Sequence, residues 1–230
     1  MDAQLLASIE PSLSTARLHR YQSPTGVPLE TAVNYLWNIE LCEAFYYSLH
    51  AVEIALRNGL HRSLTQHFGI PQWYDGQGIL EPDQKRTVQL VKDRIQRRGD
   101  SVTPDRVVSE LTFGFWVVLL SRPYDARLWT ANSAGNLKHV FMRIPKRQRQ
   151  RQVIHQRYNS IRELRNRVMH HEPLFDDHIL RQRHGEVYQA LHWLNPRMVD
   201  VVEWYDRFPD IYMHGKGRVE AKLKAELGIP

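Results

Sequence analysis

Residues 29–68 read LETAVNYLWNIELCEAFYYSLHAVEIALRNGLHRSLTQHF, a stretch with no proline and a single glycine, Gly59. Its apolar residues recur at spacings of three and four, the period that places side chains on one face of an α-helix. They are Leu36, Ile39, Phe45, Leu49, Val52, Leu56 and Leu60. Gly69 and Pro71, which follow, are typical of a helix end. We therefore expect one long helix, or two stacked in series.

The rest of the chain continues this pattern between proline and glycine breaks, which predicts helices over 82–99, 103–111, 136–142, 145–169, 176–193, 196–206 and 216–227. A break is expected at Phe113-Gly114-Phe115 and a loop at 121–134. Residues 11–28 carry three prolines and read as a loop or a loosely docked arm. No alternating apolar run is long enough to predict a sheet, so the expected fold class is all-α.

The expected organisation is an N-terminal arm at 1–28, a single helical domain at 29–207 and a C-terminal helical extension at 208–230. At 230 residues, 42% hydrophobic and 24% charged, the composition is that of a globular protein. The one cysteine, Cys42, excludes an internal disulfide and reads as a small buried apolar residue. The start of the chain lacks a secretory pattern, and the longest apolar run, 115–120, is too short to span a bilayer. These features predict a soluble cytoplasmic protein that does not engage a membrane.

The strongest charge asymmetry lies between residues 143 and 167. Nine basic residues face a single acid, Glu163, in this segment, and the basic residues are Arg143, Lys146, Arg147, Arg149, Arg151, Arg157, Arg162, Arg165 and Arg167. A solvated helix face is the ordinary explanation of a charge run. Surface helices usually intersperse acids at i,i+4, however, and this one largely does not. The imbalance favours contact with a polyanion such as RNA, through Arg147, Arg149, Arg151, Arg157, Arg162 and Arg167.

This basic segment leads into Arg165-Asn166-Arg167-Val168-Met169-His170-His171-Glu172, which Pro173 follows. Arginine holds phosphate with a fixed fork of donors, and histidine exchanges protons near neutral pH. Such groups suit cleavage of a phosphodiester without a metal. Asn166 and His170 are helical neighbours at i,i+4, whereas Arg165 and His170 lie about 140° apart around an ideal helix. The site therefore requires that the helix deform near Pro173, or that a second copy supply the complementary groups across a two-fold axis.

Each of these residues also has a structural explanation. Arg165 could be an ion-pair partner, His171 a core histidine on the apolar side of the helix, and Glu172 a partner for an arginine or a histidine. His170, on the polar side, is harder to explain structurally. Adjacent histidines with a glutamate suggest a metal, but the His-Glu-x-x-His spacing of zinc proteases is absent. We expect no metal and no cofactor.

The segment Arg165-Asn166-Arg167-Val168-Met169-His170 resembles the Arg-Asn-x-x-x-His signature of HEPN-domain ribonucleases. The wider setting resembles the Abi-like (abortive-infection) branch of bacterial phage-defence proteins. That likeness rests on residues 52–58 with Trp73 downstream, on 110–116, and on 164–174 with His170-His171-Glu172-Pro173. These segments are spread over roughly residues 30–180, and their order is more specific than the Arg/His motif alone.

The resemblance implies a HEPN-like helical bundle, a homodimer with a composite active site, and metal-independent RNA cleavage that leaves a 2′,3′-cyclic phosphate. It implies His170 as the acid/base, Arg165 as the stabiliser of the charge on phosphorus, and Asn166 as the residue that orients His170. His171 and Glu172 would support them. Related toxins carry tyrosine two residues after the histidine. Here that position is Glu172, which does not support a tyrosine-modifying antitoxin. The family's partners include small non-coding RNAs.

The leading functional hypothesis is thus an RNA endonuclease that acts as an abortive-infection effector or a toxin. The alternative is a non-catalytic RNA-binding or regulatory protein that uses the same basic face. A DNA-binding regulator is a third class, but no compact helix-turn-helix with a polar recognition helix is present in the sequence.

Overall fold

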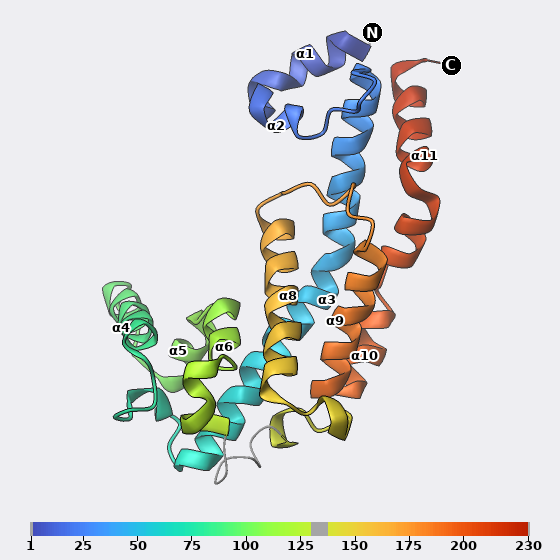
Figure 1. The fold of residues 1–230 in the computed structure, drawn as a ribbon. Helices are drawn as coiled ribbons and strands as arrows, with labels where there is room; N and C mark the ends of the chain where they lie inside the picture. The colour runs from blue at the N-terminus through green and yellow to red at the C-terminus, as the bar shows by residue number, and fades with distance from the viewer. Residues whose placement is uncertain (1, 130–137, 230) are drawn as a thin grey trace. The chain divides into compact units, whose positions relative to one another are not determined.

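Proline or threonine lies at the start of many of the described helices, and glycines at positions 69, 99 and 228 follow the ends of three of them. The structure, a computed structural model, describes residues 2–129 and 138–229, the first five of them by backbone alone. Its helices are α1 (Asp2–Leu13), α2 (Thr15–His19), α3 (Pro28–Phe68), α4 (Pro82–Arg97), α5 (Pro104–Glu110), α6 (Phe113–Val118), α8 (Arg151–Met169), α9 (Leu180–Leu194), α10 (Pro196–Glu203) and α11 (Phe208–Leu227) (Figure 1). Short helical turns are η1 (Trp73–Asp75), η2 (Arg122–Tyr124), η3 (Asp125–Trp129) and η4 (Lys146–Gln148). The described residues contain no strand, which confirms the all-α prediction.

The stretch 29–68 forms one helix, α3, which is 41 residues long (Figure 1). Its buried stripe repeats at spacings of three and four: Val33, Trp37, Leu41, Phe45, Leu49, Val52, Leu56, Leu60 and Leu64. The prediction was wrong for Leu36 and Ile39, which are 37% and 45% exposed. Trp37, Leu41 and Phe45 follow one another at spacings of four, whereas Ile39 lies six residues before Phe45, so the buried residues are the ones that keep the helical spacing.

Several other boundaries differ from the sequence-based expectation. The expected loop at 11–28 is helical at 11–13 and 15–19, where the Ser14 side chain caps α2 by accepting from the backbone N–H of Arg17. The expected break at 113–115 is the start of α6, because Thr112 accepts from the backbone N–H of Phe115 and caps a new helix there. Residues 122–129 of the expected loop form η2 and η3.

The helix expected at 145–169 begins only at Arg151. Arg149 has a non-helical backbone (φ −78°, ψ 57°), which separates η4 from α8. The helix expected over 136–142 is present at 138–140, whereas residues 136 and 137 lie outside the described residues. The C-terminal helix begins at Phe208, earlier than expected, and it is kinked at Gly215, whose φ is 59°.

The chain divides into two compact units, each assembled from separate segments. Unit 1 contains residues 1–48, 164–185 and 204–230, and unit 2 contains residues 49–163 and 186–203. In unit 1, Phe208 lies between Phe45, with ring centroids 4.8 Å apart, and His184, with ring centroids 4.3 Å apart. Within unit 2, the core includes Trp73 and Trp116, whose ring centroids lie 6.3 Å apart, and both rings are fully buried.

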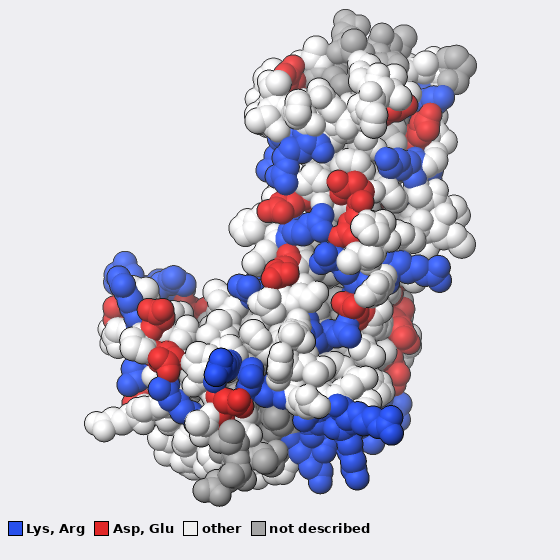
Figure 2. Space-filling view, in the orientation of Figure 1, with Lys and Arg blue, Asp and Glu red and all other residues white. Residues whose placement is uncertain are grey.

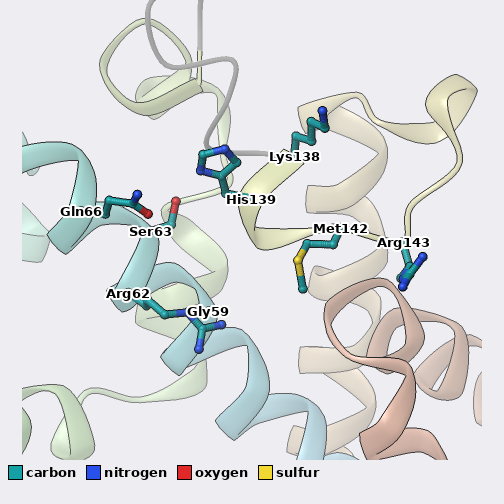
Figure 3. Close-up of a pocket in the computed structure, with 8 residues that line it drawn as sticks. All are labelled: Gly59, Arg62, Ser63, Gln66, Lys138, His139, Met142 and Arg143. Carbon is teal, nitrogen blue, oxygen red and sulfur yellow. The ribbon is translucent and has the colours of Figure 1, made fainter.

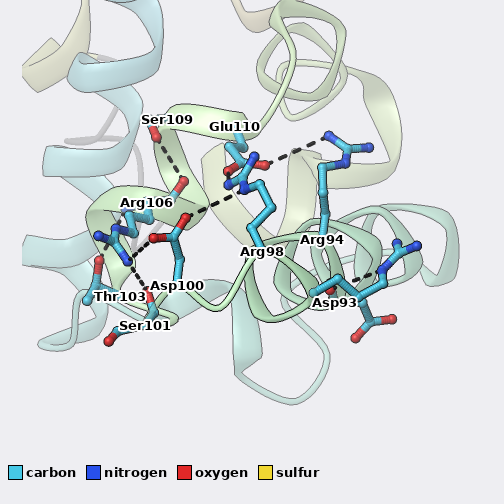
Figure 4. Close-up of polar contacts among 10 residues, drawn as sticks. Asp93, Arg94, Arg98, Asp100, Ser101, Thr103, Arg106, Ser109 and Glu110 are labelled. Atoms are coloured by element: carbon cyan, nitrogen blue, oxygen red, sulfur yellow. Dashed lines mark hydrogen bonds and ion pairs between the residues drawn. The ribbon is translucent and has the colours of Figure 1, made fainter.

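An ion-pair network joins α4 and α5 within unit 2 (Figure 4). Arg98 pairs with Glu110 and also lies 3.5 Å from Asp100, which accepts from Arg106 at 3.2 Å. Thr103 caps α5 by accepting from the backbone N–H of Arg106 at 3.4 Å. Most of these charges are solvent-exposed, so each pair contributes little by itself, and the geometry of the connected network matters more.

Candidate functional site

The Arg/His motif lies where α8 ends, in unit 1. The backbone N–H of Glu172 donates to the Arg167 carbonyl at 2.8 Å, and that of His171 donates to the Val168 carbonyl at 3.2 Å. These two hydrogen bonds form a Schellman motif, which satisfies carbonyls at the end of a helix. His171 occupies the left-handed position of this motif with φ 55°, where glycine is the usual residue. Because His171 is not a glycine, its left-handed backbone is strained, and this strained residue directly follows His170.

Two side chains from the N-terminal part of unit 1 hold this turn in place. Asn38 is 2% exposed; its Oδ1 accepts from the backbone N–H of Leu174 at 2.5 Å, and its Nδ2 donates to the Glu172 carbonyl at 3.4 Å. The hydroxyl of Tyr21 donates to the His171 carbonyl at 3.1 Å and accepts from Asn38 at 3.2 Å. Sequence reasoning missed both residues. The available signal was Asn38 itself, a polar residue between the apolar residues Trp37 and Ile39.

His170 is exposed and still follows the geometry of α8. Its backbone N–H donates to the Asn166 carbonyl at 2.9 Å, which is the i,i−4 hydrogen bond of an α-helix. The deformation begins one residue later, at His171. Arg165, which is half-buried, and His170 therefore keep their helical separation of about 140° around the axis. The sequence left two ways to bring the two groups together, deformation of the helix or a second copy of the chain. The deformation that is present does not turn His170 towards Arg165.

The structure also places Asn166, which was expected to orient His170, and the two supporting residues His171 and Glu172. Asn166 and His170 are joined by a backbone hydrogen bond, and no hydrogen bond within the described residues joins their side chains. His171 is exposed, so the explanation that it is a core histidine is wrong; the left-handed turn carries its side chain off the apolar side of α8. Glu172 is half-buried, and its carbonyl accepts from Asn38.

Several arginines expected to bind RNA have partners inside the protein. Arg167 pairs with the largely buried carboxylate of Asp177 at 2.7 Å and also donates to the Pro173 carbonyl. In unit 2, Arg157 lies 3.0 Å from Glu186, and Arg162 donates to the Asn159 side chain at 3.1 Å. These contacts explain part of the basic excess structurally, because each guanidinium is fixed by groups from this chain.

Arg149 and Arg151 have structural partners as well. Arg149 donates to the Ile144 carbonyl at 3.2 Å, while Arg151 donates to the Leu120 carbonyl at 2.9 Å and pairs with Asp125 at 3.1 Å. Of the six arginines expected to bind RNA, Arg147 is exposed, and its guanidinium has no partner among the described residues.

A basic surface precedes α8 in the chain. Its residues are Lys138, Arg143, Lys146 and Arg147; all four are exposed, and none has an acidic partner within the described ranges. In Figure 2, Lys and Arg side chains gather at the lower right of the view, where Figure 1 draws the segment that precedes α8. The surface available to a polyanion in unit 2 thus centres on residues 138–147, earlier in the chain than most of the arginines that the sequence indicated.

A cavity of about 530 Å³ adjoins the motif within unit 1. Its lining includes Tyr21, Tyr35, Cys42, Met169 and His171. Cys42 is half-buried here, where full burial was expected, and burial raises the pKa of its thiol to about 11 although the nearby Arg167 opposes the shift. The thiol is therefore protonated at neutral pH and is a poor nucleophile.

A second histidine was missed by sequence reasoning. His155, on α8 in unit 2, lines a cavity of about 610 Å³ together with Arg122, Arg151 and Asp125. Burial lowers the pKa of His155, and the positive charges of Arg151 and Arg162 lower it further. A neutral imidazole beside arginines can accept a proton next to a bound anion. The signal in the sequence was a histidine four residues after Arg151, inside the basic segment.

Comparisons of the chain with protein-family models, curated proteins and solved structures gave no match. In residues 2–129 and 138–229, no helix combines the length and the apolar character needed to cross a bilayer. Within the same ranges, no three His, Cys, Asp or Glu side chains converge in a way that could hold a metal ion.

Proposed function

We propose that this protein is a metal-independent RNA endonuclease in which Arg165 and His170 carry out the chemistry. The main support is the exposed imidazole of His170, whose backbone stays in helical register at the end of α8 through its hydrogen bond to Asn166. Asn38 and Tyr21 hold the backbone of the turn that follows, at residues 171–174, and so restrain the end of the helix that carries this imidazole. The exposed basic surface at residues 138–147 adds a binding surface for a polyanion.

In the proposed reaction an imidazole of His170 takes the proton of an RNA 2′-hydroxyl. The 2′-oxygen forms a bond to the adjacent phosphorus, and the bond from phosphorus to the 5′-oxygen breaks. The leaving 5′-oxygen takes a proton, and the products are a 2′,3′-cyclic phosphate and a 5′-hydroxyl. The guanidinium of Arg165 stabilises the charge that builds up on the phosphoryl oxygens.

The separation of Arg165 and His170 around α8 makes a two-fold dimer part of this proposal. In a symmetric dimer, Arg165 of one copy can lie beside His170 of the other, and the same pairing recurs across the axis. Two copies of His170 also provide one base for the 2′-hydroxyl and one acid for the leaving group. Cross-linking or analytical ultracentrifugation at the protein concentration of the cleavage assay tests this requirement.

Cleavage of a mixed RNA pool at neutral pH in excess chelator tests the proposed activity. We expect His170→Ala to lower the rate by about 10²–10⁴-fold, the usual contribution of general acid–base catalysis. Arg165→Lys keeps the charge but removes the planar fork, and it should lower the rate by a large factor as well. His178→Ala is the matched control, because His178 is an exposed histidine of unit 1 outside the motif.

Three outcomes have distinct meanings. Equal cleavage by the wild type and by His170→Ala excludes His170 as the acid/base. Loss of cleavage in His155→Ala, with His170→Ala unaffected, moves the catalytic centre to the cavity beside Arg151 in unit 2. Salt-sensitive RNA binding that Arg147→Ala weakens, with no cleavage product, supports the alternative of a non-catalytic RNA-binding protein.

The resemblance to Abi-like proteins extends this proposal to a role as an abortive-infection effector or a toxin. On that basis we expect induced expression of the wild-type protein to arrest growth of a bacterial host, and expression of the His170→Ala variant to permit it. Arrest by both proteins at equal expression levels would reject a role that depends on cleavage.

A further inference from the structure

A second cavity in unit 2, of about 490 Å³, lies outside the Arg/His motif and has a different chemical character. It is formed by one face of α3 near Gly59 and by residues 138–143 (Figure 3). Figure 3 shows Arg62 and Met142 extending into the space between these two segments, with Lys138 and Arg143 on the far rim. Its size falls in the range of small-molecule sites, about 300–1,000 Å³.

The charges that line this cavity are all positive. Arg62, Lys138 and Arg143 are exposed, none has an acidic partner among the described residues, and no Asp or Glu contributes to the lining. The cavity beside His155 differs, because Asp125 there neutralises Arg151. Three unneutralised cations around one concave site favour an anion that carries more than one negative charge.

A buried hydroxyl provides an independent indication of a ligand. Ser63 lines the cavity and is 6% exposed, and its Oγ has no hydrogen-bond partner among the described residues. Buried polar atoms are nearly always paired, so an orphaned hydroxyl beside a cavity requires an explanation. Gln66 and His139 border the cavity next to it (Figure 3); both are exposed, so their side chains can move and admit a ligand oxygen to Ser63.

We propose that this cavity binds a phosphate monoester. A monoester carries a charge of about −1.5 to −2 at neutral pH and three strong acceptor oxygens, which match three cations and a hydroxyl donor. An internal phosphodiester of RNA carries only one charge and two free oxygens, so it would make fewer ion pairs and hydrogen bonds in this cavity. The monoester comes from a free nucleotide or from the phosphorylated end of an RNA strand.

Isothermal titration calorimetry on the full chain tests this assignment, with adenosine 5′-monophosphate as the probe and adenosine as its uncharged counterpart. We expect the monophosphate to bind and adenosine not to bind. Arg62→Ala and Arg143→Ala should each weaken binding about ten-fold or more, whereas Arg197→Ala should leave it unchanged. Arg197→Ala is the matched control. It removes the same charge, but Arg197 is a 91% exposed side chain of unit 2 that lies outside the cavity.

Ser63→Ala separates ligand binding from fold stability. Removal of an unpaired buried hydroxyl from a helix should leave the melting temperature unchanged or raise it, because alanine is the better helix former and needs no partner. The same variant should weaken binding of the monophosphate several-fold. Normal binding of the monophosphate by Ser63→Ala would show that Ser63 takes no part. Normal binding by both Ser63→Ala and Arg62→Ala would overturn the site.

Two oligonucleotides of one sequence, with a 5′-phosphate or a 5′-hydroxyl, distinguish the two sources of the monoester. Both are made as 2′-O-methyl RNA, which lacks the nucleophile for cleavage. Preference for the 5′-phosphate strand over the mononucleotide assigns the site to an RNA end, and the reverse assigns it to a free nucleotide. Equal binding of adenosine and its monophosphate, or equal loss in Arg62→Ala and Arg197→Ala, would refute the proposal. Because the readout is binding, failure of the proposed ribonuclease activity leaves this test valid.

Discussion

Asn38→Ala is the substitution whose consequences can be worked out most fully from the structure. Asn38 is 2% exposed, and it joins α3 to the turn after α8 by accepting from the backbone N–H of Leu174 and donating to the Glu172 carbonyl. The methyl group of alanine reaches neither. Leu174 is fully buried, so its N–H would lose the one hydrogen-bond partner that it has within the described residues, at a place that water does not reach.

Two contributions set the size of the effect. An unsatisfied buried N–H costs about 1–3 kcal/mol, and the lost hydrogen bonds contribute about 1 kcal/mol more. We expect Asn38→Ala to lower the free energy of unfolding by about 3 kcal/mol. For a chain of this size, such a change lowers the melting temperature by about 10 °C. Urea denaturation followed by circular dichroism measures the free energy directly.

Hydrogen exchange makes the test local. In Asn38→Ala the amides of Glu172 and Leu174 should lose protection beyond the global change, because they belong to the turn that Asn38 holds. Asn34→Ala is the matched control: Asn34 is equally buried but donates to the Tyr21 carbonyl at 2.8 Å instead, so the amides at 172 and 174 should keep their protection. A loss of stability below about 0.5 kcal/mol, or unchanged exchange at Leu174, would refute the clamp.

Three further predictions concern charges and titration. Asp177→Asn should cost about 2–3 kcal/mol in urea denaturation, since it removes the charge of a largely buried carboxylate that pairs with both Arg167 and Arg183. Burial lowers the pKa of His61 below its ordinary value of 6.5, partly offset by Asp105, so its contribution to stability is present above pH 6.5 and is lost as pH falls through the folded-state pKa. Its Nδ1 accepts from the Trp73 indole at 3.1 Å, and His61→Gln should therefore reduce the loss of stability between pH 7 and pH 5. The Cys42 thiol, with a pKa raised to about 11, should react with iodoacetamide at pH 8 at least ten-fold more slowly in the folded than in the urea-unfolded protein.

Each of these three predictions has its own control. Asp200→Asn removes a carboxylate that is 51% exposed and should cost less than about 1 kcal/mol. An identical pH profile for the wild type and His61→Gln would show that another group controls acid destabilisation. Equal alkylation rates of folded and unfolded protein would contradict the protonated state of Cys42.

The helical class of this chain and its long α3 could be predicted from the sequence, because the three-four spacing of apolar residues is a local property. The buried register at the N-terminal half of α3 was predicted wrongly although the spacing contained it. Trp37, Leu41 and Phe45 follow one another at steps of four, whereas Ile39 lies six residues before Phe45. Thr112 illustrates a signal that was present but overlooked, since a threonine before Phe113 is a good helix cap.

The candidate site was predictable in its residue types but not in its supports. The spacing of Arg165 and His170 indicated correctly that one straight helix separates them. The contacts of Asn38 and Tyr21 with this segment join positions more than a hundred residues apart, and no local pattern reports them. The ion pairs of Arg167 with Asp177 and of Arg151 with Asp125 could not be predicted either, because the sequence does not indicate which arginine each carboxylate contacts.

The assembly of unit 1 from three separate segments has a consequence for synthesis on the ribosome. Asn38 emerges 136 residues before Leu174, its partner in the clamp. At about 5–20 residues per second, this interval is roughly 7–27 s. During it Trp37, Leu41 and Phe45 have been made while residues 164–185 and 204–230 of their unit have not. The first half of α3 is thus an exposed apolar segment that chaperones can bind during synthesis, and a ribosome stalled before residue 164 would release a chain prone to aggregation.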